Sequence, residues 1–143
     1  MRPRTIFYIS IALIVTIAML NAAAMHWRLY WTYWWFDIPM HFLGGLWTGL
    51  FILWSVYLSG FPLNFVQRAM SMLTVALLGV VGVGVIWELF ELISRATLVS
   101  QDAYVTDTVL DLIMDTLGGL AAWGIVKAVK QETVFPEEHI YHG

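Results

Sequence analysis

The chain has no cysteine and little charge. Without cysteine it can form neither a disulfide bridge nor a thiolate metal site. Only 12% of its 143 residues are charged, whereas a typical soluble domain has about a quarter. It also lacks low-complexity tracts and any basic patch of the kind that binds nucleic acid. These absences argue against a soluble domain, a disulfide-stabilised fold and a nucleic-acid-binding protein.

Long apolar runs make up most of the sequence, in which 60% of residues are hydrophobic. A run of about 20 apolar residues is long enough to cross a bilayer as a helix. We predict an all-α polytopic membrane protein, a bundle of about four transmembrane helices in residues 1–130, followed by a polar tail, 131–143. The predicted spans are residues 5–24, 38–59, 69–97 and 108–129. The first run could be a signal peptide, but it is longer than usual for one, so we expect a retained helix.

The distribution of lysine and arginine at the span ends predicts the orientation. If the N-terminus lies inside, the inner face carries Arg2, Arg4, Arg68, Lys127 and Lys130, and the outer face carries Arg28 and Arg95. Cytoplasmic loops are enriched in these residues. We therefore expect a multipass membrane protein with both termini in the cytoplasm.

Aromatic residues crowd the segment 26–36, before the second span. Trp27, Trp31, Trp34 and Trp35 share a broad face at helical spacing. This pattern is typical of an interfacial aromatic belt or a short helix lying on the outer surface. A platform for a lipid or an isoprenoid is the alternative.

Seven ionisable side chains lie within or at the ends of the spans, on one face of each. They are Asp37 and His41 in the second span, Glu88 and Glu91 in the third, and Asp107, Asp111 and Asp115 in the fourth. Spacings of three or four residues place each set along one side of its helix. At a rise of about 1.5 Å per residue, all three sets fall near the outer membrane edge. We therefore predict that they converge there.

Six carboxylates in a low-dielectric setting require protonation, a water-filled cavity or a bound cation. Oxygen ligands with one imidazole suit Zn²⁺, Mn²⁺, Mg²⁺ or Fe²⁺, and such a set is typical of metal-assisted hydrolysis. We predict a divalent metal ion bound by His41, Glu88, Asp111 and Asp115. Asp37 or Glu91 would be the general base, and Arg95 or Arg28 would bind an anionic head group.

Structural alternatives exist for the individual residues. Asp37 could cap the second span, Asp107 could complement a helix dipole, and Glu91 could pair with Arg95. His41 could be a hydrogen-bonded packing residue. Asp111, Asp115 and Glu88 lie furthest inside and are the hardest to explain in this way.

A short internal repeat links the second and fourth spans. Residues 37–46 and 111–120 match at six of ten positions, including the pairs Gly44–Gly45 and Gly118–Gly119. Both segments would run in the same direction across the membrane, as in parallel repeats. We interpret them as two helical hairpins, each contributing one acidic helix, with the glycines allowing close approach.

The order of these motifs resembles a known family. Asp37-x₃-His41-x₃-Gly45, Glu88-x₂-Glu91 and Asp107-x₃-Asp111-x₃-Asp115 with Gly118–Gly119 resemble the YjdF-type bacterial inner-membrane proteins and, more distantly, VanZ-like proteins. The resemblance covers roughly residues 35–125, although YjdF-type proteins usually have more spans. It implies a multipass membrane protein with an acidic centre, and it implies no particular reaction.

Three functions follow from this pattern. The first is a metal-dependent membrane enzyme, hydrolase-like, acting on a lipid or lipid-linked phosphate. The second is a carrier of protons or divalent cations, since intramembrane acids also mark ion pathways. The third is a non-catalytic membrane subunit with a structural metal. Membrane lipid and a lipid-linked substrate are the expected partners, nucleic acid is not, and a homo-oligomer could supply an ion path that one chain lacks.

Overall fold

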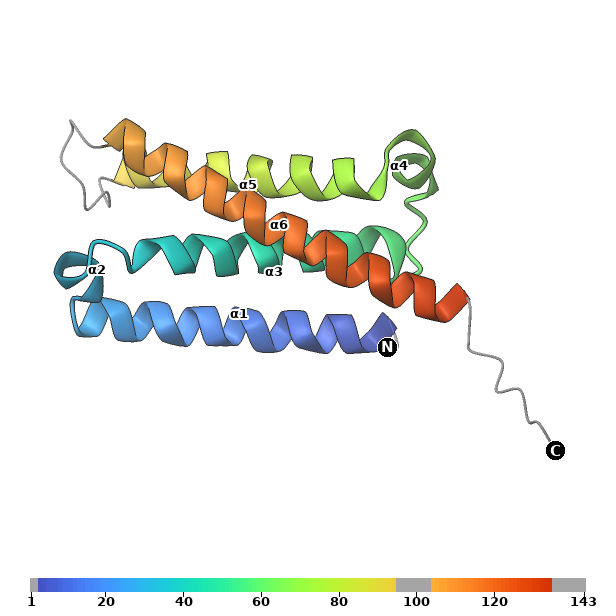
Figure 1. The fold of residues 1–143 in the computed structure, drawn as a ribbon, viewed down its shortest axis with the longest axis horizontal. Coiled ribbons are helices and arrows are strands. Elements are labelled where there is room, and N and C mark those ends of the chain that lie inside the picture. The colour runs from blue at the N-terminus through green and yellow to red at the C-terminus, as the bar shows by residue number, and fades with distance from the viewer. Residues whose placement is uncertain (1–2, 95–103, 135–143) are drawn as a thin grey trace.

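The fold is a helical bundle, and the computed structural model describes residues 3–94 and 104–134 (Figure 1). Within these ranges there are helices and no strands. They are α1 (Pro3–His26), α2 (Leu29–Thr32), α3 (Asp37–Tyr57), α4 (Asn64–Ala69), α5 (Met72–Ser94) and α6 (Tyr104–Val134). Four of them, α1, α3, α5 and α6, are long and apolar enough to cross a membrane. The predicted all-α bundle of about four spans is confirmed.

The helix ends follow local capping and turn signals. The third span begins at Met72 rather than at residue 69, because the Ser71 hydroxyl accepts a hydrogen bond from the backbone N–H of Thr74 at 3.1 Å. Such a side-chain bond is typical of a helix N-cap. Beyond α3, Gly60 adopts a left-handed φ of 81° that favours glycine. The helix α6 extends to Val134, past the expected end at residue 129.

The long helices are arranged around a crossing of α3 and α6. Both run in the same direction, whereas α1 and α5 run the opposite way (Figure 1). The helix α5 packs against both α3 and α6, and α1 packs against α3. The two acidic helices therefore lie side by side and run parallel, as the internal repeat predicts.

Glycines allow α3 and α6 to touch through their backbones. A Cβ atom on Gly45 would collide with the backbone of Asp115, and one on Gly118 would collide with that of Phe42. Further along, a Cβ on Gly49 would lie 2.7 Å from that of Ala122. Small residues at such crossings are how membrane helices gain close packing. The crossing therefore coincides with the repeated Gly–Gly pairs.

The main apolar cluster lies in the half of the bundle that holds the N-terminus. Its members are Ile6 of α1, Leu50 and Leu53 of α3, Val75 and Ala76 of α5, and Ala122, Val126 and Val129 of α6. The outer surfaces of the long helices remain apolar and exposed, and at most 33% of any spanning window is buried. A surface of this kind is suited to lipid rather than water.

Exposed aromatic side chains gather at the opposite end, around α2. Trp31, Trp34 and Trp35 are exposed, Trp34 by 83%. The expected short helix is present, and its exposed indoles fit the interfacial belt that the sequence predicts.

Candidate metal centre

The site begins in the first turn of α3. The N-cap of this helix is Phe36, with no side-chain capping bond, so Asp37 does not have the capping role that the sequence allowed. Instead its carboxylate points to His41, one turn further along. Because residues four apart share a helix face, the two side chains reach the same space. Asp37 is thus available for the site.

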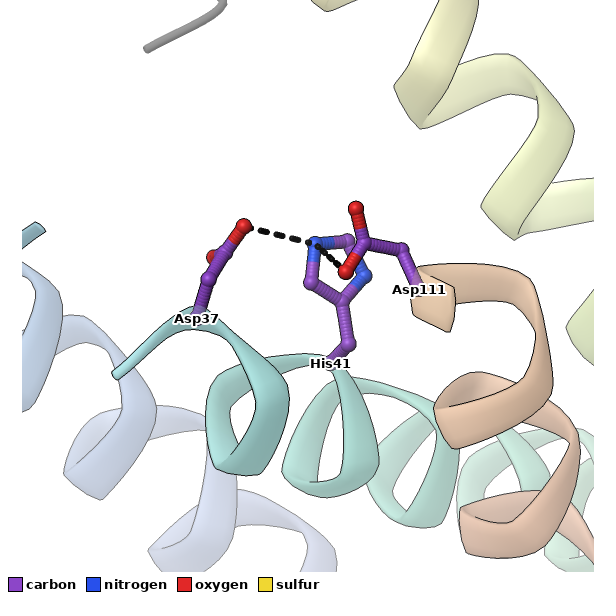
Figure 2. Close-up of side chains that lie close together, drawn as sticks. All are labelled: Asp37, His41 and Asp111. Atoms are coloured by element: carbon purple, nitrogen blue, oxygen red, sulfur yellow. Dashed lines mark ion pairs between the residues drawn. The ribbon is translucent and has the colours of Figure 1, made fainter. Parts of the chain in front are cut away.

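His41 lies at the centre of three carboxylates from two helices. Its Nε2 is 3.7 Å from Asp37 Oδ2 and 3.7 Å from Asp111 Oδ1, and its Nδ1 is 3.6 Å from Asp115 Oδ2. Figure 2 shows Asp37 and Asp111 reaching the ring from different helices. The side chains of His41 and Asp111 are only 8% and 4% exposed, whereas that of Asp37 is 33% exposed. The cluster is therefore buried around His41 and Asp111 and accessible on the side of Asp37.

The two glutamates of α5 are held by hydrogen bonds. Glu88 is buried, and its Oε2 accepts a hydrogen bond from the hydroxyl of Thr108 on α6 at 2.7 Å. Glu91 is half-buried one turn nearer the edge, and its Oε1 accepts a bond from the indole N–H of Trp87 at 2.9 Å. The remaining acid of α6, Asp107, is also half-buried. The outer acids thus form a partly open rim above the buried ones.

Sequence reasoning missed several neighbours of the site, Tyr30 above all. Burial raises the pKa of Tyr30 to about 12, and the nearby charges of Asp37 and Glu91 add to this effect. The hydroxyl stays protonated and donates a hydrogen bond to Asn21 Oδ1 at 2.8 Å. In the sequence Tyr30 is one of many aromatic residues in its segment, and nothing distinguishes it as a neighbour of acids. Thr108 and Trp87 carried no signal beyond their helical spacing from the acids.

Of the two predicted cationic residues the structure describes Arg28, and Arg28 is not part of this cluster. Among the described residues, no ion pair joins Arg28 to the carboxylates. Arg28 has a left-handed φ of 57° at the turn between α1 and α2, and with Met25 and Trp31 it lines a pocket of about 430 Å³. Arg95 lies outside the described residues. The head-group role of either arginine stays a prediction.

The donor atoms fit a single divalent ion. One ligand atom from each of Asp37, His41 and Asp111 lies within 4.8 Å of the others. Ligands bound at about 2.1 Å can be at most about 4.2 Å apart, so the 3.7 Å pairs already fit. The remaining contraction is a few tenths of an ångström, within reach of small side-chain rotations. Two carboxylates and one imidazole would leave coordination positions open on such an ion.

A comparison with protein families identifies the chain as a membrane protein. A family model described as "Predicted membrane protein (DUF2238)" matches residues 1–132. The chain belongs to this family. It is the YjdF-type family that the motifs resemble, while the VanZ-like resemblance stays a prediction. No curated protein and no solved structure matches the chain.

Proposed function

We propose that this DUF2238 protein is a metal-dependent membrane enzyme that hydrolyses a lipid or lipid-linked phosphate at the outer face of the bacterial inner membrane. The observation that carries the proposal is His41, with one ring nitrogen 3.7 Å from a carboxylate of its own helix and 3.7 Å from one of α6. Asp37 and Asp111 are 74 positions apart in the sequence, yet both reach the same nitrogen. The expected ion is Zn²⁺, Mn²⁺, Mg²⁺ or Fe²⁺, because these accept mixed oxygen and imidazole ligands.

The roles of the acids follow from their depth. Asp37, His41 and Asp111 would hold the ion, which would polarise a phosphoryl group and lower the pKa of water. Glu91 lies at the rim with its carboxylate fixed by Trp87, which suits a general base that meets substrate. Glu88, deeper and fixed by Thr108, would complete the ligand set or its surroundings. Arg28 would attract the anionic head group from the neighbouring turn.

The distribution of charge supports the orientation. Arg4, Arg68, Lys127 and Lys130 come from α1, α4 and α6, and these segments meet at the end of the bundle opposite the acids (Figure 1). An excess of basic residues marks the cytoplasmic side of a membrane protein. The acidic cluster and α2 would then face the periplasm, where lipid-linked phosphates of the outer leaflet can reach them.

A carrier is less well supported than an enzyme. The half of the bundle below the cluster is filled by the apolar core of Leu50, Leu53, Val80 and Val126. In the described residues, the buried polar side chains there are Ser10 and Thr48, and neither is ionisable. An ion would therefore need a large rearrangement to cross, whereas an enzyme needs only the open rim.

Metal analysis of the purified protein tests the proposal directly. We expect about one divalent ion per chain, lost in His41→Gln and Asp111→Asn and kept in Lys127→Gln, which changes charge at the other end of α6. The wild type should release phosphate from a phosphatidic acid or polyprenyl phosphate in mixed micelles. In the two site variants the rate of phosphate release should fall by about 100-fold or more. Absence of metal from the wild type would refute the proposal. Metal-dependent uptake of Mn²⁺ into liposomes without phosphate release would favour the carrier.

A further inference from the structure

We propose that Asp115 is a positioning residue that orients the His41 ring through Nδ1, rather than a metal ligand as the sequence predicted. The inference rests on the metal site proposed above. It assigns the two nitrogens of one imidazole to two separate tasks. Nε2 would bind the ion together with Asp37 and Asp111, and Nδ1–H would donate to the Asp115 carboxylate, which lies 3.6 Å away.

The geometry around the ring separates these tasks. Both Asp37 Oδ2 and Asp111 Oδ1 approach Nε2, each at 3.7 Å, while Asp115 Oδ2 approaches Nδ1 at 3.6 Å. The lone-pair directions of the two ring nitrogens point apart. A metal ion shared by Asp37 and Asp111 would therefore lie on the Nε2 side of the ring, whereas Asp115 lies on the Nδ1 side. A carboxylate on the second nitrogen fixes the tautomer and the orientation of a metal-binding histidine.

Asp115 is itself held in a space that glycines leave open. A Cβ on Gly84 of α5 would lie 2.7 Å from Asp115 Oδ2, and a Cβ on Gly44 of α3 would lie 3.8 Å from Oδ1. The backbone of Asp115 is pressed against Gly45, and its side chain is only 10% exposed. Three helices thus leave room for this carboxylate and little room for it to move. Such a fixed position suits a group whose task is to orient another residue.

The inference predicts that variants of Asp115 bind the metal more weakly but still bind it. Removing a carboxylate that orients a metal-binding histidine typically weakens metal binding about 10- to 100-fold. Asp115→Asn keeps an oxygen that can accept from Nδ1–H, so we expect a loss at the low end of this range. Asp115→Ala should lose more. Neither variant should change the number of ions bound at saturation.

Two glycines of α5 provide a matched pair of variants that keep Asp115 itself. Gly84→Ala would displace the Asp115 carboxylate, whereas a Cβ at Gly82 meets nothing within 4 Å. Both changes add one methyl group to the same helix. We expect Gly84→Ala to weaken metal binding about 10-fold or more and Gly82→Ala to leave it unchanged.

Spectroscopy of the ¹¹³Cd-loaded protein with ¹⁵N-labelled histidine decides between the roles. In the wild type we expect cadmium coupling to Nε2 of His41, assigned by its loss in His41→Gln, and the same coupling in Asp115→Asn. Coupling to Nδ1, or complete loss of the ion in Asp115→Asn as in Asp111→Asn, would make Asp115 a ligand and overturn the inference while leaving the proposed metal site intact. Failure of the wild type to take up cadmium, zinc or manganese would instead overturn the proposed function and, with it, this role of Asp115.

Discussion

Three acids of the site each have a neighbour that lowers the cost of their burial. Thr108 donates to Glu88, Trp87 donates to Glu91, and His41 lies close to Asp111. A hydrogen bond to a charged group contributes about 1.5–3 kcal/mol. A charge within a membrane helix costs about 2.5–3.5 kcal/mol on insertion scales. The two ranges overlap, so hydrogen bonds offset much of that cost, and protonation, water or a bound cation would supply the rest.

The bond between Thr108 and Glu88 gives a prediction for one hydroxyl group. Thr108→Val keeps the shape of the side chain and removes the donor, so it should lower the free energy of unfolding by about 1–3 kcal/mol. Thr116→Val is the matched control, because the Thr116 hydroxyl bonds only to the carbonyl of Leu112 in its own helix, at 2.7 Å. Unfolding in mixed detergent, followed by circular dichroism, measures both. Equal losses of stability in the two variants would show that the hydrogen bond to Glu88 contributes no more than a hydrogen bond within one helix.

At the scale of the helix, sequence periodicity predicted which residues share a face but not how the helices rotate against one another. Spacings of three and four placed Asp37 with His41 and Asp111 with Asp115 on single faces. They could not show that Asp37 and Asp111 approach one ring nitrogen while Asp115 approaches the other. Hydropathy likewise predicted four spans, but it did not show where the third one begins. There the Ser71 hydroxyl caps α5 and separates it from the short helix α4. The metal and catalytic roles stay predictions, because they depend on chemistry that a helix pattern does not contain.

The crossing of α3 and α6 predicts a sharp difference between glycines. Gly45→Ala and Gly118→Ala each place a methyl group against the backbone of the facing helix, which should push the helices apart. We expect each variant to lower the free energy of unfolding by about 1–3 kcal/mol or more, as is typical of overpacking. Metal affinity should fall as well, because the carboxylates of α6 would move away from His41.

Gly124→Ala is the control for these two variants. A Cβ at Gly124 meets nothing within 4 Å, and alanine is favoured over glycine in a helix by about 1 kcal/mol. It should therefore leave stability unchanged or raise it. Thermal unfolding of the three variants in the same detergent compares them, and a tolerated Gly45→Ala would contradict the close crossing.

For the whole molecule, polarity runs along the bundle from acids at one end to bases at the other. At the basic end, Lys127 lies over the ring of Trp123 at 4.8 Å and Lys130 over that of Tyr57 at 5.3 Å. Such cation–π contacts hold long basic side chains at a membrane interface, next to anionic head groups. The sequence predicted the two ends from residue counts, and the structure adds that the main apolar cluster lies beneath the acids. A site open on one side and sealed on the other favours chemistry at a single membrane face.

This polarity predicts how the protein sits in the membrane, and the absence of native cysteine makes the test simple. Trp34→Cys and Phe65→Cys introduce single thiols at side chains that are 83% and 82% exposed, near α2 and in α4 respectively. If the basic end is cytoplasmic, a membrane-impermeant maleimide should label Trp34→Cys in intact spheroplasts. Phe65→Cys should react only after permeabilisation, because the bilayer separates it from the reagent. The reverse pattern would place the acidic cluster in the cytoplasm, where its substrate would have to come from the inner leaflet.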